Sequence, residues 1–268
     1  MHVNIRVLVQ IVQKLLDREK MQKALIKLLI LLFQKDPFAF LRLIFLLLNV
    51  KDAVRVLDAG CGMGGMTILV STMARNVIGV NYCATEIEIA RKRAKRLNIK
   101  NIEFLTLDLK NLKNYQKKLG KFDHIILFEV IEHIKDDNKL IEDLSFLLKE
   151  SGKILLTTPY VNRKLLPGEY VSEIEDGSHV RWGYDLKMLD SLLRNNGFII
   201  ERIQMFGGPI TYYLAYIQRV LSANYLLKLL FQIVTYLARP LQFLDSLIIK
   251  FVFYPPYLIG VVARKANV

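Results

Sequence analysis

The sequence predicts an α/β fold built on a doubly wound, mostly parallel sheet. Residues 54–65 read as a short apolar strand that ends in an acid and runs into a glycine-rich turn. Four more apolar strands are predicted at 77–80, 102–108, 122–129 and 154–159, and helical patterns follow the second and fourth of the five strands. Such alternation places helices on both faces of a parallel sheet and a ligand site at the carboxyl ends of its strands.

The glycine-rich turn is the most informative motif. Gly60, Gly62 and Gly65 satisfy the spacing G-x-G-x-x-G of nucleotide-binding turns, with Gly64 as an extra glycine. Because glycine has no Cβ, the backbone can turn tightly here and approach a ligand. Asp58 ends the strand two residues before the first glycine, where it offers a carboxylate to a cationic cofactor end.

Two helices are predicted from apolar residues at helical spacing. The first follows strand 77–80 and presents Ile87, Ala90, Ala94 and Leu97, with basic residues on its other faces. The second follows strand 122–129 and presents Leu140, Leu144, Leu147 and Leu148. We expect the second helix to end at Ser151-Gly152, because glycine commonly terminates helices.

Several segments together resemble the class I S-adenosylmethionine-dependent methyltransferases. They are Val-Leu-Asp-Ala-Gly-Cys-Gly in the turn, Val-Ile-Gly-Val at 77–80, Leu-Asp-Leu at 107–109, and the run Phe-Asp-His-Ile-Ile-Leu-Phe-Glu-Val-Ile-Glu-His at 122–133. The resemblance covers roughly residues 51–206 and, as the last strand of a seven-stranded Rossmann-like sheet, 257–265. It implies that Asp58, Gly60 and Gly62 hold the methionine end of S-adenosylmethionine, and that Asp108 with Leu109 brackets the adenine.

Asn81 departs from the family pattern. The family usually ends its second strand in an acid that binds both ribose hydroxyls, and this chain has Asn81 there. An amide can accept from one hydroxyl and donate to the other, but without charge assistance the contact is weaker. The sequence therefore predicts a modest affinity for the cofactor.

The chain is both basic and apolar. Its 268 residues carry a formal net charge of +13, yet 53% of them are hydrophobic. Nucleic-acid-binding proteins usually combine the positive charge with a polar surface, so nucleic acid is not favoured as a partner. The two cysteines, Cys61 and Cys83, flank the predicted site and are expected to be free thiols in a reducing compartment.

Two apolar blocks lie outside the predicted core of 51–206 and its last strand at 257–268. Residues 1–50 are expected to form amphipathic or apolar helices, and 207–256 an apolar helical insert between the sixth strand, 198–206, and the seventh. Single cations interrupt both blocks, as in helices that lie in a membrane interface. The alternatives are that these helices pack on one another, form a dimer interface, or span the membrane.

The order of the strands places the insert near the acceptor site. The sixth strand leaves the sheet at its carboxyl end, where the methyl donor is expected, so the insert would form a wall or lid there. We find no signal-peptide pattern, and no charge-free stretch has the length of an ordinary transmembrane helix without a breaker. The prediction is peripheral attachment on the cytoplasmic side of a membrane.

Candidate acceptor-side residues follow the fourth and fifth strands. Glu129, Glu132 and His133 stand at i, i+3 and i+4, so they would share one face of a helix starting there. His179 comes from the later loop 160–183, which would act as a lid. Two carboxylates and two imidazoles can hold a divalent cation such as Mg²⁺ or Mn²⁺. Without a metal, His133 or His179 would act as the general base.

The E-x-x-E-H pattern is similar to that of two methyltransferase families. One comprises the O-methyltransferases of ubiquinone biosynthesis, and the other methylates the terminal 2′-hydroxyl of small RNAs; the resemblance implies a metal at Glu129, Glu132, His133 and His179. The segment from His179 to Tyr184 also resembles methyltransferases of bacterial surface polysaccharides.

The leading hypothesis is a membrane-associated O-methyltransferase that acts on a lipidic or lipid-linked hydroxyl. RNA and glycan hydroxyls remain as alternative acceptors, and a non-catalytic, membrane-bound methyltransferase-fold scaffold remains as an alternative of another class. The oligomeric state stays open.

Overall fold

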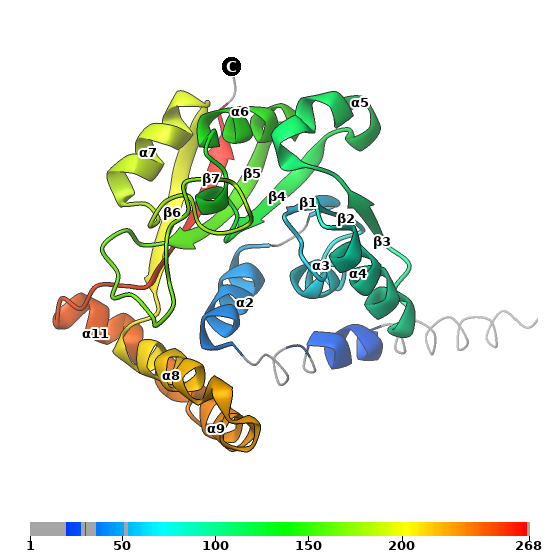
Figure 1. Ribbon diagram of the computed structural model, residues 1–268. Helices are drawn as coiled ribbons and strands as arrows, with labels where there is room; N and C mark the ends of the chain where they lie inside the picture. Colours follow the sequence, from blue (N-terminus) through cyan, green and yellow to red (C-terminus); the bar gives the residue numbers. More distant parts are fainter. Residues whose placement is uncertain (1–19, 28–29, 31–35, 51–52, 267–268) are drawn as a thin grey trace, which may run out of the picture.

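The computed structural model describes residues 20–27, 30, 36–50 and 53–266. Its centre is a seven-stranded sheet in the order β3-β2-β1-β4-β5-β7-β6 (Figure 1). β7 runs antiparallel to β5 and β6, and the other neighbouring pairs are parallel. The strands are β1 (Arg55–Ala59), β2 (Asn76–Asn81), β3 (Ile102–Thr106), β4 (Phe122–Phe128), β5 (Leu148–Pro159), β6 (Phe198–Phe206) and β7 (Leu258–Lys265). The predicted doubly wound, seven-stranded fold is therefore confirmed.

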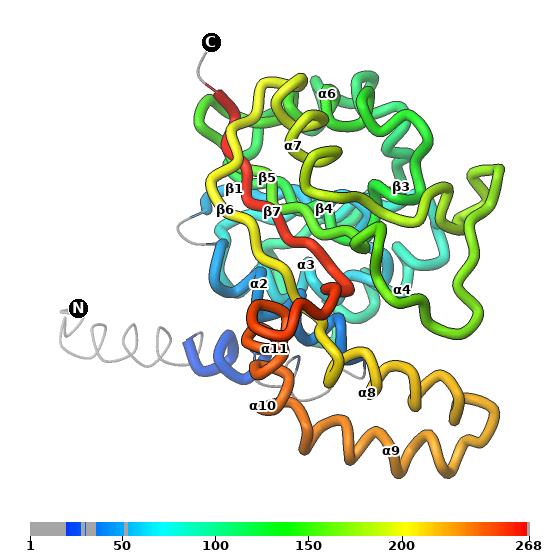
Figure 2. Tube along the Cα trace, turned by 90° about the vertical axis from the view of Figure 1, so that its left-hand side faces the viewer, coloured from blue at the N-terminus to red at the C-terminus, as the bar shows by residue number. Residues whose placement is uncertain are grey.

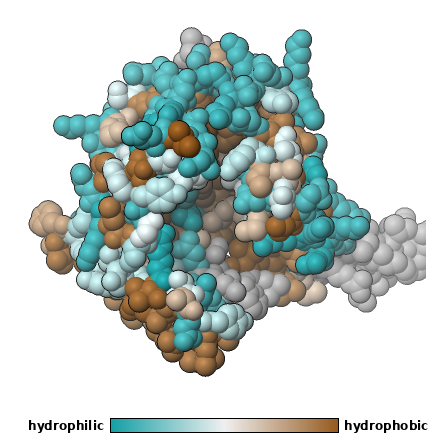
Figure 3. All heavy atoms as spheres, viewed as in Figure 1, coloured by the Kyte–Doolittle hydropathy of each residue, from teal (hydrophilic) through white to brown (hydrophobic). Residues whose placement is uncertain are grey.

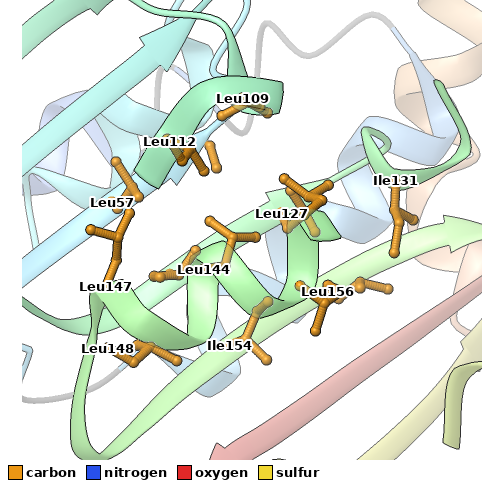
Figure 4. Packing of buried hydrophobic residues seen from close by; sticks show 14 of the residues in the cluster. Leu57, Leu109, Leu112, Leu127, Ile131, Leu144, Leu147, Leu148, Ile154 and Leu156 are labelled. Atoms are coloured by element: carbon orange, nitrogen blue, oxygen red, sulfur yellow. The ribbon is translucent and has the colours of Figure 1, made fainter. Parts of the chain in front are cut away.

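Each face of the sheet has its own apolar core, because successive strand side chains point to opposite faces. One core takes Leu57 and Leu156 from the sheet, and the other takes Val56 and Leu155. The first core is covered by η1 (Leu109–Tyr115), α5 (Gln116–Leu119), α6 (Asp137–Leu147) and α7 (Leu186–Asn195). Figure 4 shows Leu144 and Leu147 of α6 pointing toward Leu57 and Leu127.

The second core is covered by α2 (Pro37–Asn49), α3 (Gly65–Val70) and α8 (Pro209–Val220). The helix predicted after the second strand is α4 (Ala84–Arg96). It buries Ile87, Ala90 and Ala94 with Phe104 of β3, as its apolar spacing predicted.

The structure corrects the predicted end of the helix after β4. α6 ends at Leu147 rather than at Ser151-Gly152, and β5 already begins at Leu148. The register between β4 and β5 shifts between Phe122 and His124, and Ser151 has a φ of 58°. The Ser-Gly signal therefore marks an irregularity inside a strand, which a helix-termination rule misread.

α2 corrects the expectation that both apolar blocks lie in a membrane interface. Asp36 caps this helix by accepting from the Phe38 amide at 2.9 Å, and Pro37 stands in its first turn. Leu43, Phe45 and Leu46 are 0% exposed in the core beneath the sheet. α2 is thus part of the domain built on the sheet, and residues 1–19, 28–29 and 31–35 of this block lie outside the described residues.

The insert between β6 and β7 is helical, as predicted. Besides α8 it comprises η3 (Leu221–Ala223), α9 (Tyr225–Leu237), α10 (Arg239–Gln242) and α11 (Asp245–Phe251). In Figures 1 and 2, α8 and α9 lie side by side and project away from the sheet. Within the described residues, no helix combines the length and apolar character needed to cross a bilayer.

Candidate active site

The glycine-rich turn and the ends of β2, β3 and β4 border a cavity of about 510 Å³, which we name the turn cavity. Five of the six cofactor residues predicted from the sequence line it: Gly60, Gly62, Asn81, Asp108 and Leu109. They come from three different strand ends and meet because parallel strands bring their carboxyl ends to the same edge of the sheet.

Asp58, the sixth predicted residue, does not line the turn cavity. Its side chain is 3% exposed, and its Oδ2 accepts a 2.6 Å hydrogen bond from Thr67 Oγ1 in α3. Burial raises the pKa of Asp58 to about 6, and the hydrogen bond from Thr67 partly offsets that rise. Asp58 therefore ties β1 to α3 behind the turn, and its role in holding the methionine end of the cofactor stays a prediction.

The glycines have different roles from those that their spacing predicts. Gly60 has a φ of 85°, and a Cβ there would lie 2.3 Å from Val130 Cγ2. Gly64 has a φ of 78°, and its Cβ would lie 2.8 Å from the Phe104 ring. Gly65 has open space around the Cβ position. The glycine that close helix–strand packing requires is therefore Gly64 rather than Gly65.

Glu86 is a cavity residue that the sequence analysis missed. It lies in the first turn of α4, and its Oε2 accepts a 2.5 Å hydrogen bond from Asn81 Nδ2. Both side chains line the turn cavity. A carboxylate thus stands beside the strand end that lacks an acid of its own. The available signal was an acid in the first turn of the helix that follows β2.

The three residues predicted to share a helical face after β4 do not do so. β4 is followed by Glu129 with a φ of 53°, and only a short 3-10 helix, η2 (Ile131–His133), comes after it. The Glu129 carboxylate accepts from Thr157 Oγ1 at 2.9 Å and lies 3.4 Å from the Arg42 guanidinium. The left-handed backbone conformation at Glu129 separates its side chain from the helical register of the next two residues.

Glu132, His133 and His179 come together although the last is distant in sequence. Each offers one ligand atom, and these atoms all lie within 4.8 Å of one another. The two imidazole rings meet edge to face with centroids 4.7 Å apart. Among the described residues, the buried Oε1 of Glu132 and Nδ1 of His133 have no hydrogen-bond partner. Both predicted catalytic histidines therefore belong to one polar cluster.

Burial controls the protonation of this cluster. It raises the pKa of Glu132 well above the usual carboxyl value, and the neighbouring Glu129 raises it further. Burial, followed by the charge of His133, lowers the pKa of His179 to about 4. His179 is therefore a neutral imidazole at pH 7, with a nitrogen lone pair that can accept a proton.

A second cavity, of about 570 Å³, lies beside the first, and we name it the insert cavity. Glu129, His133 and Gly177 line both cavities, so the two join at the polar cluster. The insert cavity is also lined by His179, by Arg219 of α8 and by Lys228 of α9. The insert therefore walls a cavity next to the glycine turn, as the order of the strands predicted.

The loop 160–183 contributes residues to both cavities and is anchored by its own charged residues. The Arg163 side chain is 0% exposed and pairs with Glu169 at 3.2 Å. Arg181 forms an ion pair with Asp137 and donates to the carbonyl of Ile134. These two arginines hold the loop to the core.

The cluster of Glu132, His133 and His179 has a chemistry that fits a divalent cation. It offers one carboxylate oxygen and two imidazole nitrogens, and two of these groups hold buried atoms without a partner. This donor set suits manganese, cobalt or zinc, and the carboxylate also accepts magnesium. Glu129, which was predicted as a fourth ligand, lies outside the group.

The fold and the two joined cavities define an enzyme that brings a nucleotide-type cofactor and a second molecule together at the carboxyl edge of an α/β sheet. A family model described as a methyltransferase domain matches residues 50–194, which is more than half of the chain. The chain belongs to the class I S-adenosylmethionine-dependent methyltransferases. The resemblance seen in the sequence is thereby confirmed, and so is the cofactor that it implied.

Named relatives support the same family. The chain is 30% identical over 129 residues to a ubiquinone biosynthesis O-methyltransferase of Acinetobacter baumannii, a match that covers 47% of this chain and 51% of that protein. It is 31% identical over 155 residues to a "Probable S-adenosylmethionine-dependent methyltransferase" of Mycobacterium tuberculosis, covering 58% and 52%. The chain thus spans about half the length of these curated relatives.

Solved structures share the fold at low identity. A coclaurine N-methyltransferase bound to N-methylheliamine and S-adenosylhomocysteine superposes with a TM-score of 0.57 at 16% identity, covering 85% of this chain and 72% of that one. The [4+2]-cyclase SpnF has a TM-score of 0.56 at 19% identity, covering 82% and 78%. Proteins with this fold are therefore named for different reactions, so the fold alone does not identify the methyl acceptor.

Proposed function

We propose that this methyltransferase transfers a methyl group to a hydroxyl of a lipidic or lipid-linked acceptor at a membrane surface. The observation that carries the proposal is the junction of the two cavities at Glu129 and His133, with the insert forming one wall of the second cavity. An oxygen acceptor is also supported by the names of the ubiquinone-biosynthesis relatives.

The polar cluster can deprotonate a hydroxyl. S-adenosylmethionine, when bound, would supply the methyl group: the acceptor oxygen would attack the methyl carbon in line with the carbon–sulfur bond, which breaks and releases S-adenosylhomocysteine. In our proposal His179 accepts the hydroxyl proton, because the imidazole is neutral and lines the insert cavity. His133 lies against the His179 ring, and both would position the oxygen at the junction.

A metal-assisted form of the same reaction uses the same residues. Glu132, His133 and His179 would hold a divalent cation, which would lower the pKa of the acceptor hydroxyl. Transfer that stops in excess chelator and returns with Mg²⁺ or Mn²⁺ would support this form. Full transfer in chelator would leave His179 as the base and contradict the metal.

The insert supports a membrane surface as the place of the reaction, because its burial pattern is inverted. Leu226, Leu230 and Leu237 of α9 are 62%, 53% and 77% exposed, whereas the residues that α9 buries are Gln232 and Thr235. Figure 3 shows apolar surface gathered over α8 and α9. A helix of a water-soluble domain shows the opposite arrangement.

Polar contacts hold the inside of the insert together. Asp245 is 1% exposed and accepts from the amides of Ile210 and Thr211, both at 2.9 Å. Gln242 is 2% exposed and donates to Thr211 Oγ1 at 2.9 Å. These hydrogen bonds keep α8, α10 and α11 associated, while Ile217 of α8, Leu241 of α10 and Leu247 of α11 stay exposed.

The shape of the apolar surface favours lipid over a second protein copy. On α9 the exposed apolar residues run from Tyr225 to Leu237, and at about 3.6 residues per turn they occupy more than half of the helix circumference. Further exposed aromatic residues, Phe251 and Phe253, follow at the end of α11. A flat dimer interface covers one side of a helix, whereas lipid can surround it.

The proposed function is tested by finding which molecule takes the methyl group. The protein is incubated with native membranes and, separately, with their lipid extract, in the presence of isotopically labelled S-adenosylmethionine. Label that partitions into the organic phase and survives mild base treatment, which cleaves esters, supports a lipid ether. Label confined to RNA or to water-soluble glycan would overturn the lipidic acceptor in favour of those alternatives.

A further inference from the structure

We propose that the acceptor carries a phosphate group, which Arg219 and Lys228 bind at the end of the insert cavity formed by α8 and α9. This inference rests on the proposed function and names the chemical class of its acceptor more closely.

Helices α8 and α9 contain one charged residue each. In α8, Pro-Ile-Thr-Tyr-Tyr-Leu-Ala-Tyr-Ile-Gln-Arg-Val, it is Arg219. In α9, Tyr-Leu-Leu-Lys-Leu-Leu-Phe-Gln-Ile-Val-Thr-Tyr-Leu, it is Lys228. Both residues line the insert cavity, and so does Ser222 of η3. Two mainly apolar helices therefore direct their only charges into the same cavity.

The other Arg, Asp and Glu side chains that line the insert cavity have ion-pair partners. Arg42 lies 3.4 Å from the carboxylates of both Asp36 and Glu129. Glu169 pairs with Arg163 at 3.2 Å. In the described part of the chain, neither Arg219 nor Lys228 forms an ion pair. The cavity therefore presents two cations that an anionic ligand can neutralise.

Arg219 is also oriented for such a ligand. Its Nη1 donates a 2.8 Å hydrogen bond to the carbonyl oxygen of Pro167, which fixes the guanidinium against the loop. The remaining N–H groups can donate to phosphate oxygens, which the planar guanidinium matches well. Lys228 supplies a second positive charge without a directional requirement.

The anion site and His179 line the same cavity. In the lipidic case, the phosphate would sit at the polar boundary while the chains follow the exposed apolar surface of α9.

Calorimetry on protein loaded with S-adenosylhomocysteine tests the phosphate site directly. The probes are dihexanoyl phosphatidic acid below its micelle concentration, dihexanoylglycerol, and inorganic phosphate. We expect phosphatidic acid to bind at least about tenfold more tightly than dihexanoylglycerol, since charge-assisted hydrogen bonds are lost in the latter. The double variant Arg219→Gln/Lys228→Gln should remove this preference. Lys250→Gln is the matched control, because Lys250 is exposed on α11 and does not line the cavity.

The outcomes distinguish a failure of the phosphate site from a failure of the proposed lipid O-methylation. Equal binding of phosphatidic acid and dihexanoylglycerol, or a preference that survives in the double variant, would overturn the phosphate site. Inorganic phosphate that binds as tightly as phosphatidic acid, and is lost in the double variant, would support the site but contradict a lipidic acceptor. A methylated lipid without phosphorus, identified by mass spectrometry in the labelling experiment, would overturn the phosphate inference and leave lipid O-methylation standing. Unchanged affinity for S-adenosylhomocysteine in each variant verifies that the protein is folded.

Discussion

The Asn81 side-chain amide donates to the Glu86 carboxylate over 2.5 Å at the wall of the turn cavity. The acid that many relatives are expected to have at the end of the second strand is thus supplied here by the next helix. We infer that Asn81 and Glu86 together contact the ribose hydroxyls of the cofactor.

This relationship predicts an unusual response to the substitution that would restore the family pattern. Asn81→Asp should weaken cofactor binding by about tenfold, because two carboxylates would then face each other at hydrogen-bond distance. Glu86→Gln alone should weaken binding as well. The double variant Asn81→Asp/Glu86→Gln should recover affinity, since it restores one donor and one acceptor. Calorimetry measures the affinity of the wild type and the three variants for S-adenosylhomocysteine. Tighter binding by Asn81→Asp alone than by the wild type would refute the pairing of Asn81 with Glu86.

Asp58 should make the stability of the protein depend on pH. Its folded-state pKa of about 6 lies above the ordinary value of 3.8, so the folded state binds more protons than the unfolded state between these values. The contribution of Asp58 to the free energy of unfolding therefore falls as the pH rises from about 4 to 6. The side chain introduced by Asp58→Asn cannot ionise. The free energy of unfolding of this variant, relative to that of the wild type, should therefore increase as the pH rises from about 4 to 6. Urea denaturation at pH 4.5 and 7.5 measures the difference, and a difference that does not change with pH would contradict a raised pKa.

The glycine turn should respond to alanine position by position. Gly60→Ala and Gly64→Ala place a Cβ against Val130 and Phe104 in a left-handed backbone, so each should destabilise the fold by about 1–3 kcal/mol. Gly65→Ala meets open space and should change stability by less than about 0.5 kcal/mol. Urea denaturation without ligand measures these effects. Similar losses in all three variants would show that the turn does not pack as described.

His179 should titrate at an acid pH. Burial is the main cause of its pKa of about 4, and His133 is the second. In His133→Gln the pKa of His179 should rise yet stay below the ordinary value of 6.5, because burial persists. The C2 proton of His179, assigned by comparison with His179→Gln, reports both values by NMR. If His179 is the base, kcat/KM should fall only as the pH drops toward 4. A midpoint near 6.5 in the free enzyme would place His179 in a more solvated site.

Membrane attachment should depend on the insert and not on α2. Replacing Leu226, Leu230 and Leu237 by serine should abolish flotation with vesicles that contain anionic lipid, because these exposed side chains supply the apolar contact. Leu48→Ser on α2 is the matched control, since Leu48 is 54% exposed but lies outside the insert. Wild-type protein that forms dimers and does not float would show that a second copy covers the apolar surface instead.

The fold could be predicted because its signals are local. β6 was expected at 198–206 and is observed there, since a run of apolar residues bounded by turns is a property of the chain itself. The clustering of Gly60, Asn81, Asp108 and Leu109 at one cavity also followed, because parallel strands bring their carboxyl ends together. The predicted free state of Cys61 and Cys83 agrees with the structure.

The errors have a common cause. Composition describes α2 and α9 in the same terms, as leucine-rich helices with a single cation, yet α2 is buried in the core and α9 exposes its leucines. Whether an apolar face is covered depends on which element lies opposite to it in space. No pattern within either helix contains that information.

The sequence by itself determined the seven strands in their order along the chain, the helices α4 and α6, the helical insert, the glycine turn and the methyltransferase family. Tertiary structure alone decided that Asp58 faces Thr67, that Glu86 completes the strand end at Asn81, and that Glu129 leaves the cluster of Glu132, His133 and His179. Spacing along the chain fixes side-chain directions only while the backbone stays regular. At the strand ends, where Glu129 adopts a left-handed conformation and loops from distant segments converge, packing between elements sets those directions.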